Sequence, residues 1–465
     1  MYISRRTLLA GLSLTFIELA AKAAPNSNIV LRAEQSLKRF KPDFKNEASI
    51  YTYNISNSNV LAKEPLVSGS LIRLKKGDPM SVRLENTLPS PTSLHWYGVR
   101  GPNSMDGVTG LTQTPVKQGE VFDYTFTPPD SGLFWYHPLH KGSSAEQQDR
   151  GLYGLLIIEE PDAPMVDQDI GVVIDDWNLS SEGEIIPDQS SSDSIAQGGR
   201  LGNFLTVNGV AAPQPILAAP NGRIRLRFLN ATRARICPLK FENVQAHVIA
   251  IDGQACDPFD PLRRTVVMSP GSRFDVIVDI PMEEHVTGQI GISLGSVLPL
   301  LSIRSSGKKS EKKPPLLRLA GNDLPAAIRL QNALRTELVI TGGQSIPVAS
   351  KSDLLDNTKI WQINGAYFTG FNGKPLFSVK RGTPIVVNIT NKTAWPQVIH
   401  VHGHNFRLLH AFDDGWEPYF LDTLFIAAGR SSLISFVADN IGKWAIRSSI
   451  LDHFEGGVVT WFEVI

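Results

Sequence analysis

The histidines are the residues of this chain whose types and spacing point to metal chemistry. The sequence contains ten histidines, and seven of them fall into clusters. These clusters are His95; His137 with His140; and His400, His402 and His404, with His453 downstream. The run His400-Val401-His402 alternates as on a β-strand, so both imidazoles project from one face and can serve one metal ion. Two of the remaining three, His247 and His285 in the middle of the chain, match no ligand spacing, and we expect these two to be structural.

Short strands must position these histidines. Runs rich in Val, Ile, Phe and Thr alternate with polar residues between clusters of Gly, Pro, Asn and Asp, as in residues 80–84 and 385–389. Helical periodicity is scarce. The pattern predicts an all-β protein built from Greek-key sandwiches or barrels.

An internal repeat predicts three such units. In each unit a Gly is followed eight or nine residues later by an Asn, with an alternating strand between them; the pairs are Gly77 and Asn86, Gly222 and Asn230, and Gly382 and Asn391. A second repeated segment starts at Gly119, at Gly429 and, more weakly, at Gly271. We predict domains at residues 24–160, 161–304 and 326–465, with a linker at 305–325 that includes the polar, charged run 305–313.

Motifs around the histidines make the chain resemble the multicopper oxidase family over nearly its full length. They are Leu94-His95-Trp96-Tyr97-Gly98, Phe134-Trp135-Tyr136-His137, Ile251-Asp252-Gly253, His400-Val401-His402-Gly403-His404-Asn405-Phe406 and Leu421-Asp422-Thr423. The resemblance implies three cupredoxin-like domains. It also implies a blue copper in the last domain and a trinuclear copper centre between the first and last domains, where oxygen is reduced to water.

The chain departs from that family at the blue-copper position. The resemblance places Gln397 where the family has a histidine, Ser448 where it has the cysteine, and Val458 at the axial position, so that only His453 survives. A blue site needs a thiolate and two imidazoles, and a serine hydroxyl does not ionise at neutral pH. The sequence therefore predicts no blue copper and no laccase-type activity.

Most ligands of the type 3 copper pair are replaced as well. The residues at those positions are Tyr97, Leu139, Arg447 and Ser449. The alignment of Arg447 with a ligand is supported within the chain, because Gly132 precedes His137 by five residues and Gly442 precedes Arg447 by five. A permanent cation at this position is expected to repel a copper ion beside it.

Four histidines remain for a metal. The resemblance assigns His95 and His400 to the type 2 copper, with His137 and His402 nearby, and we expect these four to hold at most one Cu²⁺ or Zn²⁺ between the first and third domains. His140 and His453 are further candidates. The alternative is that the histidines are relics that hydrogen-bond to each other and to water in the seam between domains.

Two aspartates and two cysteines are expected to have structural roles. Asp106 is expected to be a turn residue before Gly107, and Asp452 a partner of Arg447 or His453. The spacing of the two cysteines, Cys237 and Cys256, leaves open whether they pair or stay buried and free.

The first residues resemble an export signal. Arg5 and Arg6 precede an apolar stretch, residues 8–20, and Ala21-Lys22-Ala23 reads as a cleavage site. The paired arginines favour a twin-arginine signal at residues 1–23 and a periplasmic protein, with an ordinary secretory signal as the alternative. No later apolar run is long enough to span a bilayer, and Lys plus Arg equals Asp plus Glu at 45 each, so nucleic acid is not an expected partner.

Two functions are compatible with this sequence. The first is a non-oxidase binding or scaffolding protein of the periplasm, similar to degenerate members of the family that act in cell division, with the division machinery as partner. The second is a copper-binding oxidoreductase that uses a residual type 2 site. Family membership alone would favour a third, an intact oxidase, but the missing cysteine argues against it.

Overall fold

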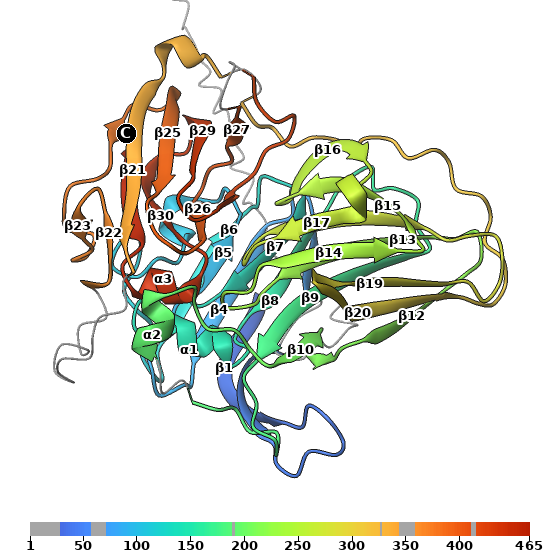
Figure 1. The fold of residues 1–465 in the computed structure, drawn as a ribbon. Coiled ribbons are helices and arrows are strands. Elements are labelled where there is room, and N and C mark those ends of the chain that lie inside the picture. Colours follow the sequence, from blue (N-terminus) through green and yellow to red (C-terminus); the bar gives the residue numbers. More distant parts are fainter. Residues whose placement is uncertain (1–27, 57–70, 188–190, 326–327, 344–358, 411–414) are drawn as a thin grey trace, which may run out of the picture.

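The computed structural model describes residues 28–56, 71–187, 191–325, 328–343, 359–410 and 415–465. These residues form six β-sheets, which pack as three pairs along the chain (Figure 1). The predicted all-β fold is confirmed. The predicted signal, residues 1–23, lies outside the described residues.

The first pair of sheets contains strands β1 to β8. Their orders are β2-β1-β4-β6 and β3-β8-β7-β5. The bounds are β1 Asn28–Lys38, β2 Ala48–Ser56, β3 Ile72–Lys75, β4 Met80–Asn86, β5 His95–Tyr97, β6 Val121–Phe126, β7 Gly132–His137 and β8 Gly154–Glu159.

The middle pair contains strands β9 to β20, in the orders β11-β10-β9-β13-β18-β15-β16 and β12-β20-β19-β14-β17. The bounds are β9 Gln168–Trp177, β10 Phe204–Val207, β11 Val210–Ala211, β12 Gln214–Ala218, β13 Arg223–Asn230, β14 Cys237–Glu242, β15 Gln245–Ile251, β16 Gln254–Phe259, β17 Thr265–Met268, β18 Arg273–Asp279, β19 Thr287–Leu294 and β20 Ser296–Ser305.

The third pair contains strands β21 to β31, in the orders β23-β22-β21-β25-β29-β27 and β24-β31-β30-β26-β28. The bounds are β21 Leu334–Gly342, β22 Trp361–Ile363, β23 Ala366–Tyr367, β24 Ser378–Val379, β25 Thr383–Asn391, β26 Gln397–Val401, β27 Arg407–Leu409, β28 Thr423–Ile426, β29 Ser431–Ala438, β30 Gly442–Ser448 and β31 Val459–Val464. The described helices are short: α1 Ser144–Asp149, α2 Ser191–Ala196 and α3 Leu451–Glu455, with 3₁₀ turns η1 Asn103–Met105, η2 Leu262–Arg264 and η3 Leu330–Asn332.

The internal repeat of the sequence corresponds to one strand arrangement that recurs three times. Strands β4, β13 and β25 each pair in parallel with the first strand of their unit and antiparallel with β6, β18 or β29, which follow the second repeated glycine. The asparagine that ends each of these strands donates its amide to backbone carbonyls of the loops beyond it, as Asn86 does to Ser90 and Val116. The repeated asparagine is therefore explained by loop anchoring.

Each pair of sheets encloses its own apolar core, because alternate residues of the strands face inward. Strand β4 shows this alternation directly, with Met80, Val82 and Leu84 fully buried. A smaller apolar cluster joins the first unit to the third and contains Val108, Leu139, Ala445, Phe454 and Val459. The histidines predicted to bind metal lie at this same junction.

Residues 306–325 have no regular secondary structure but are anchored by side-chain contacts. Asn322 donates to the carbonyl of Ser131 at 2.8 Å and to Oε1 of Gln254 at 2.9 Å, and Leu319 is buried against the middle unit. The segment therefore ties the first and middle units together. The predicted domain limits remain a prediction.

Two further expectations concern the cysteines and the membrane. Cys237 and Cys256 are both buried and free, so they do not pair with each other. Among the described helices, none has the length and apolar character needed to cross a bilayer.

Candidate metal centre

Strand pairing brings the predicted histidines together. His95 on β5 lies opposite His137 on β7, and His400 on β26 lies opposite Arg447 on β30. His402 follows the end of β26, and its backbone N–H donates to the carbonyl of Ala445 at 3.0 Å. Arg447 therefore stands in the third unit where His137 stands in the first, as the glycine spacing predicts.

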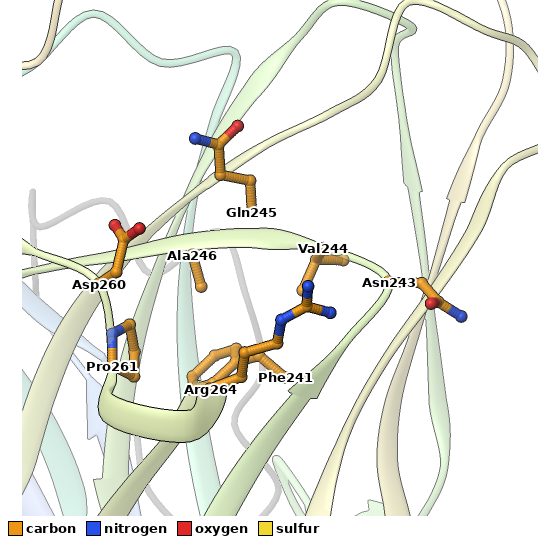
Figure 2. A pocket seen from close by; sticks show the side chains of 8 residues that line it. All are labelled: Phe241, Asn243, Val244, Gln245, Ala246, Asp260, Pro261 and Arg264. Atoms are coloured by element: carbon orange, nitrogen blue, oxygen red, sulfur yellow. The ribbon is translucent and has the colours of Figure 1, made fainter.

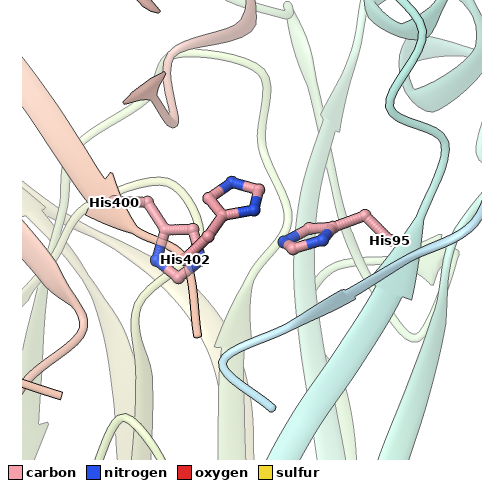
Figure 3. Close-up of side chains that lie close together, drawn as sticks. All are labelled: His95, His400 and His402. Atoms are coloured by element: carbon pink, nitrogen blue, oxygen red, sulfur yellow. The ribbon is translucent and has the colours of Figure 1, made fainter. Parts of the chain in front are cut away.

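Three of these imidazoles converge on one point. One ring nitrogen from each of His95, His400 and His402 lies within 4.8 Å of the others (Figure 3). The His95 and His402 rings stack with centroids 4.1 Å apart, and the His137 ring lies 5.5 Å from that of His95. All four side chains are buried, so the site between the first and third units is shielded from bulk solvent.

A hydrogen bond to each Nδ1 fixes the tautomer of all four imidazoles. The contacts are His95 to the Asp106 carbonyl at 2.7 Å, His137 to the Pro138 carbonyl at 2.8 Å, His400 to the Asp422 carbonyl at 2.9 Å and His402 to Asp106 Oδ2 at 2.9 Å. Because these oxygens accept, the proton resides on Nδ1 and the Nε2 lone pairs are left for a cation. Burial lowers the pKa of His400 to about 4 and the pKa values of His137 and His402 well below the usual range. These three imidazoles are therefore neutral at pH 7.

Arg447 divides the four lone pairs into two sets. Its Nε donates to Nε2 of His402 at 3.0 Å, and its Nη2 donates to Nε2 of His137 at 3.1 Å. Burial lowers the pKa of Arg447 to about 10, so the guanidinium is still a cation at neutral pH. By contrast, the Nε2 atoms of His95 and His400 are buried and have no hydrogen-bond partner among the described residues. Two imidazoles already bind a cation, and two have free lone pairs.

Asp106 supplies the opposite charge. Its carboxylate accepts from His402 and lies 3.3 Å from Nδ1 of His95. Burial alone would raise the pKa of Asp106, but the imidazoles of His402 and His95 outweigh it and hold that pKa well below its usual range. His402 thus links a buried carboxylate to the buried guanidinium of Arg447.

The turn interpretation of Asp106 also fits the structure. Gly107 has a φ of 81°, and a Cβ there would lie 2.0 Å from the carbonyl oxygen of Leu94. Only glycine fits this close approach. The turn aims the preceding carboxylate at the histidines, a role that the sequence did not reveal.

Residues of the middle unit fix the position of Asp422, whose carbonyl accepts from His400. Arg273 donates to both oxygens of Asp422, at 2.9 and 2.5 Å, and Asp252 accepts from the backbone N–H groups of Asp422 and Thr423 at 3.2 Å. Burial and the Asp422 carboxylate raise the pKa of Asp252 to about 7. Both Asp252 and Asp422 belong to motifs that carry the family resemblance, but only the folded structure shows that they contact each other.

The two further candidates, His140 and His453, have their polar contacts elsewhere. His140 is partly buried, and its Nδ1 lies 3.0 Å from the hydroxyl of Thr109. His453 is fully buried, with Nδ1 3.0 Å from Oε1 of Gln397 and Nε2 2.6 Å from the carbonyl of Gln197. Neither belongs to the group that can share one ion.

The prediction that Asp452 pairs with Arg447 or His453 was wrong. Asp452 forms a bidentate ion pair with Arg233 of the middle unit and accepts from the backbone N–H of Arg200 at 2.9 Å. Arg447 instead donates to the imidazoles of His137 and His402. His453 lies against the amide oxygens of Gln397 and Gln197. The spacing along the chain did not reveal the arginines that the middle unit contributes.

The residues at the substituted ligand positions have other contacts in the protein and supply no ligand for copper. The hydroxyl of Tyr97 lies 2.6 Å from that of Ser449 and 2.8 Å from that of Thr423, and its ring stacks on His400 at 3.7 Å. Leu139 packs into the apolar cluster between the units. The donor set therefore fits neither a blue copper nor a type 3 pair, whereas the free Nε2 atoms of His95 and His400 fit one divalent ion.

Comparison with known proteins supports the family resemblance. Two different family models, each described as multicopper oxidase, match the chain, one at residues 47–163 and the other at residues 345–465. The chain is 27% identical to the multicopper oxidase MmcO of Mycobacterium tuberculosis, over 86% of this chain and 82% of that protein. It is 26% identical to Laccase-1 of Cryptococcus neoformans var. grubii, over 88% of this chain and 78% of that protein.

A solved structure agrees. The multicopper oxidase of Pseudomonas thermotolerans superimposes with a TM-score of 0.80 at 26% identity, covering 94% of this chain and 98% of that one. The two matched segments include all four clustered histidines, His95 and His137 in the first and His400 and His402 in the second. Fold, histidine positions and sequence agree: the chain belongs to the multicopper oxidase family.

Proposed function

We propose that this protein is a non-oxidase member of the multicopper oxidase family that binds one divalent ion, with copper as the expected metal, at His95 and His400. The observation that carries the proposal is the placement of Arg447. Its guanidinium binds His137 and His402, the two imidazoles that the family resemblance places near the type 2 position. A copper ion next to this cation would meet charge repulsion and would find both lone pairs already engaged.

Oxygen reduction would also need a path for electrons, and the residues at the blue-copper position offer none. Gln397 and Ser448 have no thiolate or imidazole, and Val458 is apolar. When bound at His95 and His400, a single copper would supply Lewis-acid or one-electron chemistry. The chain's own contribution is to hold both imidazoles as Nδ1–H tautomers, through the carbonyl groups of Asp106 and Asp422.

Activity and metal content test this proposal together. After copper loading, we expect no oxygen uptake with phenols, diamines or cuprous ion, and at most one copper per chain. The double variant His95→Ala/His400→Ala should lose that copper, whereas the control His140→Ala should keep it. Because the relatives are named as oxidases and laccases, robust copper-dependent oxygen uptake by the wild-type protein would refute the non-oxidase proposal.

We further propose that the protein works by binding a periplasmic protein, with the division machinery as the expected partner. The support is the loss of the oxidase ligands in a fold that is otherwise complete. Cross-linking in cells followed by identification of the captured proteins tests it. Capture of division proteins by the wild type and by His95→Ala/His400→Ala alike would support a scaffold that needs no metal, and failure to capture any would refute this role.

Export to the periplasm by the twin-arginine route is part of the proposal. Its support is the pair Arg5 and Arg6 before an apolar stretch. Changing both to Lys should leave the precursor in the cytoplasm, and normal export of that variant would refute the route.

A further inference from the structure

A pocket lies in the middle unit, and none of its lining residues belongs to the metal centre. It is a cavity of about 510 Å³ beneath the turn that joins β14 to β15 (Figure 2). Phe241, Val244, Ala246 and Pro261 line it with apolar groups, and Asn243, Gln245, Asp260 and Arg264 line it with polar ones; Arg264 extends into it from η2. Apolar surface beside converging polar groups is found in sites for small organic ligands.

A second cavity of about 600 Å³ adjoins the first, since Phe241, Asn243 and Arg264 line both. Its other charged residues are Lys240, Glu242 and Arg263. This cavity therefore has three cationic side chains and one carboxylate. Its charge favours an anionic group, while the apolar side chains of the first cavity offer contacts to an apolar one.

Two of these cations have no partner. Arg263 and Arg264 are exposed, and neither guanidinium forms a hydrogen bond or ion pair with any described residue. Lys240 is engaged, because its Nζ donates to the carbonyl of Arg263 at 2.7 Å. The carboxylate of Asp260, which lines the first cavity, lies 2.6 Å from Nδ1 of His247. Among the described residues that line the two cavities, the cationic groups without a partner are the two guanidinium groups.

The backbone that presents these arginines is strained. Arg263 has a φ of 53° and Arg264 a φ of 56°, in the left-handed region that disfavours side chains with a Cβ. The Lys240 contact holds this conformation, as do the hydrogen bonds from the Arg264 N–H to the Pro261 carbonyl at 2.8 Å and from the Thr265 hydroxyl to the Arg263 carbonyl at 3.2 Å. Strain in two successive arginines at a pocket rim points to a functional site.

The same turn exposes an apolar side chain. Leu262, between Pro261 and Arg263, is 83% exposed. An isolated exposed leucine is common, but here it stands beside two unpaired guanidinium groups and an apolar cavity. The combination matches a ligand that is anionic at one end and apolar at the other.

We propose that this pocket binds the phosphate group of an amphiphilic ligand. The phosphate lies against Arg263 and Arg264, whose planar guanidinium groups suit bidentate contact with its oxygens. The apolar part lies against Phe241, Val244 and Pro261. Such a ligand comes either from a soluble organic phosphate or from an anionic phospholipid headgroup, in which case Leu262 enters the headgroup region of the bilayer.

Two probes distinguish these sources. Phenyl phosphate, followed by calorimetry, represents the soluble ligand, and co-sedimentation with phosphatidylglycerol-containing vesicles represents the lipid. The test variant Arg263→Gln/Arg264→Gln removes both guanidinium groups. The matched control Arg335→Gln/Arg430→Gln removes two exposed arginines outside the pocket, so that it corrects for net charge.

At least one probe should bind the wild type saturably, and the test variant should weaken that binding tenfold or more while the control leaves it unchanged. Loss of vesicle binding on Leu262→Ser, with phenyl phosphate binding retained, would identify the lipid as the source. Binding of phenyl phosphate without vesicle binding would identify a soluble ligand. The proposal is overturned if neither probe binds, or if the control loses as much binding as the test variant.

Discussion

Replacing Arg447 by Met tests whether its guanidinium serves as a built-in cation of the histidine cluster. The side chain is 1% exposed and donates to His137 and His402 at 3.1 and 3.0 Å, and Asp106 is the carboxylate at the other end of His402. Removing one member of a buried charged network costs about 3–5 kcal/mol, because the remaining charge is left uncompensated. We therefore expect the metal-free variant to unfold at a markedly lower temperature than the wild type.

Bound copper should then restore part of the stability that Arg447→Met loses. In the variant, the Nε2 lone pairs of His137 and His402 join those of His95 and His400, so copper has up to four ligands instead of two. A ligand present at 100 times its Kd stabilises the folded state by about 2.7 kcal/mol, and tighter binding at the same concentration stabilises it more. Scanning calorimetry with and without copper should show a larger copper-induced rise in Tm for Arg447→Met than for the wild type.

A matched control separates this effect from general destabilisation. Arg227 is as deeply buried as Arg447 and pairs with Asp169 and Asp275 in the middle unit. Arg227→Met should lower the Tm but leave the response to copper as in the wild type. The reasoning is refuted if metal-free Arg447→Met is as stable as the wild type, or if copper raises the Tm of both proteins equally.

Three further predictions concern other parts of the molecule. Burial lowers the pKa of His453 to about 4. Between about pH 6.5 and 4, the unfolded chain therefore binds a proton at this residue that the folded chain does not bind. The contribution of His453 to the free energy of unfolding is complete above about pH 6.5 and is lost as the pH falls towards 4. His453→Gln should therefore flatten the fall in Tm across that range, and an unchanged slope would contradict the buried neutral state. Glycine relieves left-handed strain at Arg263, so Arg263→Gly should be more stable than Arg263→Ala by about 1 kcal/mol in chemical denaturation; equal stabilities would contradict the strain. Cys237 and Cys256 are unpaired, and burial raises the pKa of Cys256 to about 12. Both thiols should therefore react with a thiol reagent in denaturant without reductant, but only slowly in the native protein. Finding no reactive thiol in denaturant would show that the two cysteines pair.

Patterns of short range predicted the fold well. Period-two alternation reflects strand geometry, and each recurring Gly–Asn pair brackets a single strand, so both patterns can be recognised within about ten residues of the chain. The equivalence of Arg447 with a ligand position could also be predicted, since Gly132 and Gly442 begin corresponding strands, β7 and β30.

Contacts between units were harder to predict. The sequence indicated that Arg447 would repel copper, but not that it would donate to His137, 310 positions away in the chain. Asp452 was assigned to neighbours in its own unit, whereas its partner Arg233 comes from the middle unit. A carboxylate and a guanidinium carry no periodic pattern, so only the packing of the units reveals which of them meet.

The most direct test of the central claim is the metal content and spectrum of the purified, copper-loaded protein, compared with His95→Ala/His400→Ala. We predict at most one copper per wild-type chain, with a type 2 paramagnetic resonance signal and without the intense visible absorption of a thiolate-bound copper. The double variant should bind none at this site and retain the fold. Two or more coppers per chain with that absorption, or one copper bound with unchanged affinity in the double variant, would contradict the claim.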